Sequence, residues 1–274
     1  MNIIIRHIEN LSLAPVLVAV VNSAAFYLLQ NDSINGLALL ILGLICWIVY
    51  MYDGLRDIIR FPAESTSSRH LFIQKHQFNI SILVIAACIL SIILLFFQNK
   101  DLIFFGSTTA IFLAIYLFLV NKSLSFRIRK EYFMPIIFTM AVCGVPMAQK
   151  TSINLSTWVL AGLFFILALQ NTFLSSWFEN RQNPNAVNIY NKISPKTGLR
   201  FVNLCNVIFI FSFIVLFSNG KELKNGLAFI YLLISLLVSF SASKADLLQK
   251  HYRILLDILL LLPLFLILFH LGLF

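Results

Sequence analysis

Long apolar runs separated by short polar segments dominate the chain. Nine runs of about 20 residues are almost free of charge: 11–30, 33–52, 77–99, 102–121, 132–149, 151–178, 201–220, 225–243 and 254–274. A helix needs roughly 20 apolar residues to cross a bilayer, whereas barrel strands would alternate over about ten positions. The pattern therefore predicts an all-α polytopic membrane protein with nine transmembrane helices. No low-complexity linker divides the chain, so we expect a single integral membrane domain over 1–274.

The first apolar run has a second interpretation, as a secretory signal peptide. Arg6 precedes the run, and Ser23, Ala24 and Ala25 resemble a cleavage site. The run nevertheless continues to Leu29, which is long enough to span a membrane. We therefore interpret it as the first transmembrane helix.

The basic residues between the runs predict the orientation. Of the 20 Lys and Arg residues, 16 lie in the N-terminal segment and the loops after the second, fourth, sixth and eighth runs. Lys and Arg accumulate on the cytoplasmic side of membrane proteins. We therefore expect a cytoplasmic N-terminus and an external C-terminus in a cytoplasmic (inner) membrane. The two long loops, 53–76 and 179–200, would both be cytoplasmic, and long polar loops tend to carry function.

Composition supports the membrane interpretation and excludes two others. Hydrophobic residues make up 60% of the chain and charged residues 11%, whereas about a quarter of a soluble domain is charged. The net charge of +9 does not indicate nucleic acid as a partner, because the basic residues are spread over short loops. All four cysteines lie in apolar runs without a CxxC pair, which favours buried thiols over a disulfide or metal site.

Oxygen-bearing side chains follow the second and sixth runs. Asp53 and Asp57 are four residues apart, as are Glu179 and Asn183, and this spacing places each pair on one face of a helix. Carboxylates at a membrane boundary are costly without a cation or solvent. Hard oxygen ligands of this kind suit Mg²⁺, which is commonly shared between carboxylates and substrate phosphates.

Basic side chains in the neighbouring loops are candidate partners for an anion. They are Arg69, His70, Lys75, His76, Lys122, Arg127, Arg129, Lys130, Lys192 and Lys196. Acidic metal ligands beside basic phosphate ligands, opening onto an apolar bundle, fit a lipid diphosphate. Ordinary ion pairs are the alternative, in which Asp53 and Asp57 pair with Arg56 and Arg60, and Glu179 pairs with Arg181 or Lys192.

These features together resemble the UbiA-type intramembrane prenyltransferases over nearly the whole chain. That family has nine helices, a cytoplasmic N-terminus and acidic motifs after helices 2 and 6. Asp53 and Asp57 match both acids of its Asn-x-x-x-Asp-x-x-x-Asp motif, with Val49 in place of the Asn. Glu179 matches the start of the second motif, where Asn183 replaces an acid. The substituted positions imply a weaker second metal site.

The resemblance implies a UbiA-like bundle and Mg²⁺-dependent transfer of a prenyl group from a polyprenyl diphosphate to an aromatic or other lipophilic acceptor. Asp53, Asp57 and Glu179 would be catalytic and, with Asn183, would hold Mg²⁺ as a Lewis acid. The substrate-binding residues would be Lys130, Arg127, Lys192, Arg69 and Asn171.

Three other functions stay open. A non-catalytic isoprenoid-lipid-binding scaffold would share the fold and the motifs. A transporter would have helices broken at mid-membrane and ionisable residues there, and no charge lies mid-run. A CDP-alcohol phosphotransferase would share Asp53-Gly54, but the remainder of its motif is missing.

Overall fold

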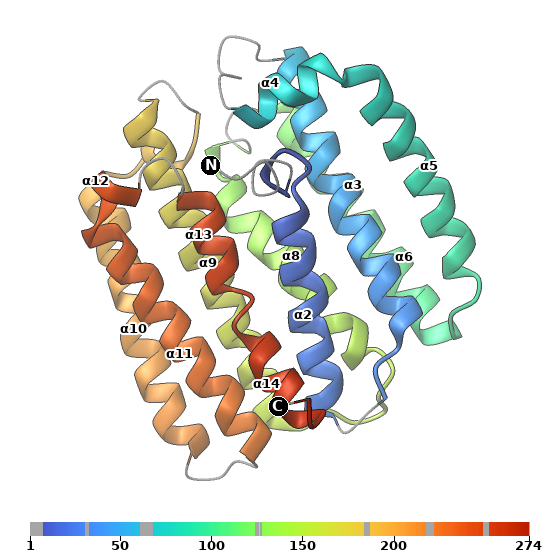
Figure 1. Ribbon diagram of the computed structural model, residues 1–274, viewed down its shortest axis with the longest axis vertical. Helices are drawn as coiled ribbons and strands as arrows, with labels where there is room; N and C mark the ends of the chain where they lie inside the picture. Colours follow the sequence, from blue (N-terminus) through green and yellow to red (C-terminus); the bar gives the residue numbers. More distant parts are fainter. Residues whose placement is uncertain are drawn as a thin grey trace.

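The computed structural model describes residues 8–30, 33–60, 68–123, 126, 128–183, 187–217, 222–248 and 252–273, and within these ranges the chain forms only helices (Figure 1). The long helices are α2 (Leu13–Leu29), α3 (Gly36–Arg60), α5 (Gln77–Leu95), α6 (Lys100–Lys122), α8 (Lys130–Met147), α9 (Leu155–Gln182), α10 (Pro195–Phe217) and α11 (Glu222–Ser243). The shorter ones are α4 (Ser68–Lys75), η1 (Ile189–Asn191), α12 (Ala245–Leu248), α13 (Tyr252–Leu259) and α14 (Pro263–His270). The predicted all-α class is confirmed.

Seven helical segments in the described ranges are long and apolar enough to cross a membrane: α3, α5, α6, α9, α10, α11 and the α13–α14 pair. The chain is therefore a multi-pass integral membrane protein, as predicted. The other two predicted spans correspond to shorter or more polar helices. The first, α2, has 17 residues, and α8 begins with Lys130 and Glu131 and contains two prolines.

The outward faces of α5, α6 and α10 are covered by large apolar side chains. Phe78 on α5 is 77% exposed, Phe104 on α6 is 76% exposed and Phe211 on α10 is 69% exposed. Contiguous apolar surface of this extent does not occur on soluble monomers. In a bilayer the same side chains contact lipid.

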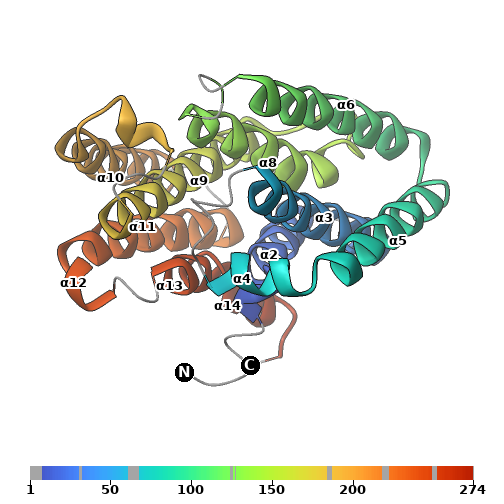
Figure 2. The ribbon, with the colours of Figure 1, turned by 90° about the horizontal axis from the view of Figure 1, so that it is seen from above.

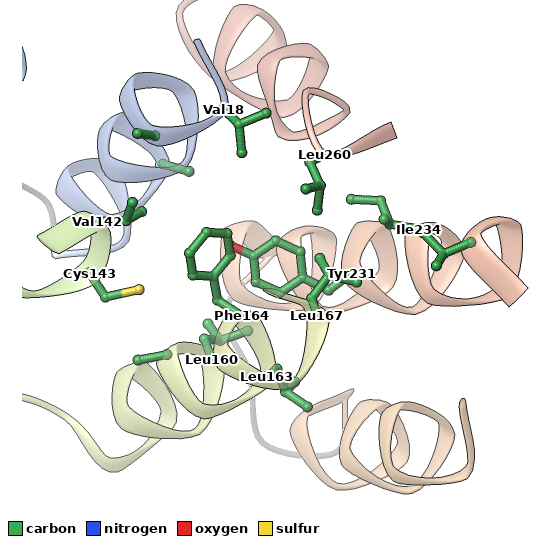
Figure 3. Close-up of a cluster of buried hydrophobic side chains, with 14 of the residues drawn as sticks. Val18, Val142, Cys143, Leu160, Leu163, Phe164, Leu167, Tyr231, Ile234 and Leu260 are labelled. Atoms are coloured by element: carbon green, nitrogen blue, oxygen red, sulfur yellow. The ribbon is translucent and has the colours of Figure 1, made fainter. Parts of the chain in front are cut away.

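The core of the bundle is built around α2, which contacts α3, α8, α13 and α14 (Figure 2). Buried side chains from α2, α8, α9 and α11 meet there, including Val18, Val142, Phe164 and Tyr231 (Figure 3). Helix α9 in turn contacts α8, α10, α11 and α13. These contacts hold α8 and α9 side by side.

The last predicted span is not continuous. Helix α13 ends at Leu259 and α14 begins at Pro263, since proline has no N–H to donate and its ring clashes with the preceding turn. Asn22 of α2 donates to the Leu260 carbonyl oxygen at 3.0 Å and accepts from the Tyr231 hydroxyl at 3.0 Å. Broken backbone is tolerated at membrane depth when protein groups satisfy it in this way.

A buried amide fixes the rotation of α9. The Gln170 Nε2 atom donates to the carbonyl oxygens of Val202 on α10 at 3.0 Å and Ser235 on α11 at 3.1 Å. Consecutive residues of a helix point about 100° apart. Holding Gln170 against α10 and α11 therefore turns Asn171 to another side of the helix.

The first acidic motif is helical, but the second is helical only at Glu179. Asn183 is the C-cap of α9 and has extended backbone, so the prediction that Glu179 and Asn183 share one helix face is wrong. Helix α3 continues to Arg60, beyond the predicted end at 52, so Asp53 and Asp57 lie one turn apart. Helix α9 continues to Gln182 and includes Glu179. At the upper end in Figure 1, α4 packs against α3 and closes over the motif.

Candidate functional site

A cavity of about 260 Å³ lies where α3, α4, α8, α9 and α13 meet, and we call it the polar chamber. Its ionisable lining residues are Glu9, Asp53, Asp57, Arg69, His70, Lys130, Glu131, Glu179, Arg253 and Asp257. Ser12, Thr172, Ser175 and Ser176 add hydroxyl groups to the wall. So many charged groups around one cavity in an apolar bundle are costly unless they meet a ligand or one another.

Six of the nine predicted site residues line this chamber: Asp53, Asp57, Arg69, Lys130, Asn171 and Glu179. Asn183 and Lys192 do not line it. Asn183 is the C-cap of α9, and Lys192 follows η1, where its side chain is exposed. Arg127 lies outside the described residues. The three acids of the two motifs, Asp53, Asp57 and Glu179, thus border one cavity although they are far apart in the chain.

Arg56 pairs with both acids of the first motif. Its Nη2 atom lies 2.5 Å from an Asp53 carboxylate oxygen and 2.7 Å from an Asp57 oxygen. The Arg56 side chain is only 7% exposed, compared with 39% for Asp53 and 17% for Asp57. The ion-pair alternative therefore applies to these two acids, and the side chain of Arg60 lies outside the description.

Glu179 pairs with Arg253 of α13, not with Arg181 or Lys192. The Arg253 Nη2 and Glu179 Oε1 atoms are 3.3 Å apart, and the Arg253 Nε atom also donates to the Tyr252 hydroxyl at 3.0 Å. Arg181 instead pairs with Asp246 at 2.8 Å on the surface. The expected partners of Glu179 were wrong because α13, 74 residues along the chain, packs against α9 at this depth.

Two cations of the chamber have unused donors. Arg69 donates from Nη2 to the Tyr50 carbonyl oxygen at 2.6 Å, while its buried Nε has no partner. Burial, followed by the charge of nearby Arg253, lowers the pKa of Arg69. Within the described ranges, the Lys130 ammonium makes no hydrogen bond and no ion pair. Acids of the chamber lie near both cations but leave these donors unused, so the donors are available to an anionic ligand.

Gly54 lets α4 bring Arg69 this close to α3. A Cβ atom at this position would collide with the Ile73 Cδ1 atom and lie 3.1 Å from the Arg69 Nη2 atom. A larger residue there would therefore force the side chains of Ile73 and Arg69 to shift.

Glu131 is a chamber residue that the sequence analysis missed. It is 2% exposed, and its Oε1 atom accepts from the Ser176 hydroxyl at 2.8 Å and from the Ile189 N–H at 3.4 Å. Its Oε2 atom is buried without a partner. Glu131 therefore connects α8 to α9 and η1. No motif spacing signals it; its position beside Lys130 is the only hint.

Binding of Mg²⁺ by the motif acids stays a prediction. Among the residues that the structure describes, no group of three or more His, Cys, Asp or Glu side chains is placed to hold a metal. Arg56 occupies oxygens of Asp53 and Asp57, and Arg253 occupies Glu179. Each of these ion pairs uses one carboxylate oxygen, so a metal ion would share the acids with the guanidinium groups.

A smaller apolar pocket of about 50 Å³ adjoins the chamber. The two cavities share the lining residues Pro15, Tyr50, Met134, Asn171, Thr172 and Asp257. Beyond these, the pocket is lined by Val18, Pro135, Phe138, Phe164, Ala168 and Leu260. The rings of Phe138 and Phe164 stack with centroids 5.9 Å apart. The site as a whole thus joins a charged chamber to a small apolar pocket.

Comparison of the chain with protein-family models, curated proteins and solved structures finds no match.

Proposed function

We propose that this protein binds a polyprenyl diphosphate with its diphosphate in the polar chamber and transfers the prenyl group to a lipophilic acceptor within the membrane. The observation that carries the proposal is the pair of cations with unused donors, Lys130 and Arg69, beside an apolar pocket. An anionic head would accept hydrogen bonds from these donors, and the first part of the isoprenoid chain would lie against Phe138 and Phe164.

The chemistry follows from these positions. Breaking the allylic carbon–oxygen bond leaves negative charge on the diphosphate, and Lys130, Arg69 and Arg253 would stabilise that charge. Charge-assisted contacts to phosphate are among the strongest hydrogen bonds that proteins make. The allylic carbon would become cationic next to the Tyr50 ring, whose face attracts positive charge.

The resemblance to the UbiA-type family supports the same proposal. Asp53, Asp57 and Glu179, which match acids of the two family motifs, border one chamber, although Glu179 lies 126 residues after Asp53. In this account the acids orient arginines: Asp53 and Asp57 hold Arg56, and Glu179 holds Arg253.

A non-catalytic lipid-binding scaffold is the second candidate. It is favoured by the arginine pairing of all three motif acids and by Val49 and Asn183 at the substituted motif positions. The scaffold would bind the same diphosphate as the enzyme but would not transfer its prenyl group.

We further propose that α2 and α8 also cross the bilayer, giving nine spans in a UbiA-like bundle with a cytoplasmic N-terminus. The support is their length of 17 and 18 residues, or about 26 Å at 1.5 Å per residue, and their contacts with spanning helices. Labelling of single cysteines introduced at residues 30 and 150 from outside the cell tests this. Protection of both sites would contradict it.

The functional test uses purified protein with farnesyl diphosphate labelled in the prenyl group and the phosphates, in EDTA or in Mg²⁺. We expect binding in EDTA, weakened about 10- to 100-fold by Lys130→Met. Lys192→Met is the matched control, since Lys192 is exposed and outside the chamber. Release of pyrophosphate with a prenylated product supports the enzyme, and binding without release supports the scaffold. Binding of the diphosphate that requires Mg²⁺ and is unchanged by Lys130→Met would contradict the proposed binding mode.

A further inference from the structure

The boundary between the two cavities has its own chemistry. Six residues shared by the chamber and the pocket form it, and we call them the neck: Pro15, Tyr50, Met134, Asn171, Thr172 and Asp257. They come from five helices, α2, α3, α8, α9 and α13. With a diphosphate in the chamber and its chain in the pocket, the bond that breaks would lie at the neck.

Asp257 differs from the three motif acids of the chamber. Asp53, Asp57 and Glu179 each pair with an arginine. Among the residues in the structural description, no group makes a hydrogen bond or ion pair with Asp257. Its carboxylate borders both cavities and is free to accept a hydrogen bond from a ligand.

A second acceptor lies in the same wall. The Oδ1 atom of Asn171 is buried and has no hydrogen-bond partner. The neighbouring Thr172 hydroxyl is already used within α9, at 2.9 Å from the Leu169 carbonyl oxygen. The neck thus offers two unused acceptor oxygens, one from α9 and one from α13. Buried acceptors are rarely left unmatched, so this wall is suited to a ligand that donates hydrogen bonds.

We propose that the neck binds the hydroxyl group of the acceptor, a lipophilic phenol or alcohol, and that Asp257 accepts its proton. This inference rests on the proposed function and specifies its second substrate. The acceptor oxygen forms a bond to the allylic carbon as the carbon–oxygen bond to the diphosphate breaks. The hydroxyl proton passes to the Asp257 carboxylate, and the bonding electrons leave with the diphosphate. No oxidant or reductant takes part.

The binding test compares 3-pentadecylphenol with its methyl ether, which has the same chain but no hydroxyl proton. We expect the wild-type protein in detergent to bind the phenol at least about tenfold more tightly than the ether. Asp257→Leu should abolish this preference, and Asn171→Leu should reduce it. Asp246→Asn, at a surface acid, is the matched control and should retain it. Equal affinity for phenol and ether, or a preference that survives in Asp257→Leu, would overturn the proposal.

The rate test uses 3-pentadecylphenol with farnesyl diphosphate. Asp257→Asn should slow transfer about 100-fold or more while the dissociation constant of the diphosphate stays within about twofold, and Asp257→Glu should restore part of the rate. Wild-type transfer rates in Asp257→Asn would overturn the proton-acceptor role. Retained diphosphate binding shows that each variant is folded.

Different results would contradict the proposed function and the proposed acceptor site. A protein that binds no farnesyl diphosphate fails the proposed function whatever its phenol preference. A protein that binds the diphosphate but does not distinguish phenol from ether fails only the acceptor site.

Discussion

Replacing Arg56 with methionine tests whether the ion pairs of the first motif stabilise the fold. Methionine keeps the aliphatic stem and removes the charge that lies 2.5 Å from Asp53 and 2.7 Å from Asp57. Removing one partner from a buried pair costs about 3–5 kcal/mol. Because Asp53 is 39% exposed, water can solvate its carboxylate once Arg56 is gone, which offsets part of the cost. Asp57 is 17% exposed, so water offsets less of the cost there. We therefore expect a loss of about 2–3 kcal/mol.

The assay is thermal unfolding in detergent, followed by tryptophan fluorescence. In a chain of this size, a loss of 1 kcal/mol lowers the midpoint by about 2–4 °C, so Arg56→Met should unfold about 5–10 °C below wild type. Arg181→Met is the matched control. Its partner Asp246 is 89% exposed, and the change should cost at most about 0.5 kcal/mol.

The same variant tests the metal question. With Arg56 gone, the two carboxylates are free to bind a divalent cation, and Mg²⁺ should raise the midpoint of Arg56→Met more than that of wild type. If Arg56→Met unfolds at the wild-type temperature, or no lower than Arg181→Met, the reasoning is refuted and the ion pairs of Arg56 do not stabilise the fold.

Three further predictions concern the stability of the helices around the chamber. Gln170→Leu breaks the link from α9 to α10 and α11 and should cost about 1–2 kcal/mol, whereas Thr108→Val on the exposed face of α6 should change little. An unchanged midpoint for Gln170→Leu would contradict the link. Asn22→Leu leaves the Leu260 carbonyl and the Tyr231 hydroxyl unpaired and should cost about 2–4 kcal/mol, more than Tyr231→Phe; equal losses would contradict this. Burial, then the charge of Arg69, lowers the pKa of His70. The folded state therefore binds fewer protons than the unfolded state, and stability should fall as the pH drops below about 6.5. His70→Gln should weaken this fall in a pH series of unfolding midpoints, and an identical slope would contradict it.

The sequence predicts the helices well because hydrophobic length is a local property. The apolar runs match the helices, and the spacing of Asp53 and Asp57 within α3 follows from the helical period. Loop charges assign Asp53 and Glu179 to the same side of the membrane, but only the packing of the helices brings both to one chamber.

The partners of the acids could not be predicted in the same way. Arg253 lies 74 residues after Glu179 and reaches it only through the packing of α13 against α9. Lys192 is the C-cap of η1, a short helix that begins with the Asn188–Asn191 capping box, and its side chain is exposed. Pro263 breaks the last span, but the amide of Asn22 that satisfies the break comes from the other end of the sequence. Such contacts join distant segments, and no local pattern encodes them.

The central claim is that an isoprenoid diphosphate occupies the chamber with its chain in the adjoining pocket. Photocrosslinking with a farnesyl diphosphate analogue that carries a diazirine near its allylic end, followed by peptide mass spectrometry, tests it most directly. We predict labels on Tyr50, Met134 and Phe138, lost on competition with unlabelled farnesyl diphosphate and reduced by Lys130→Met. Labels confined to the lipid-facing residues of α5, α6 and α10, insensitive to competitor, would contradict the account.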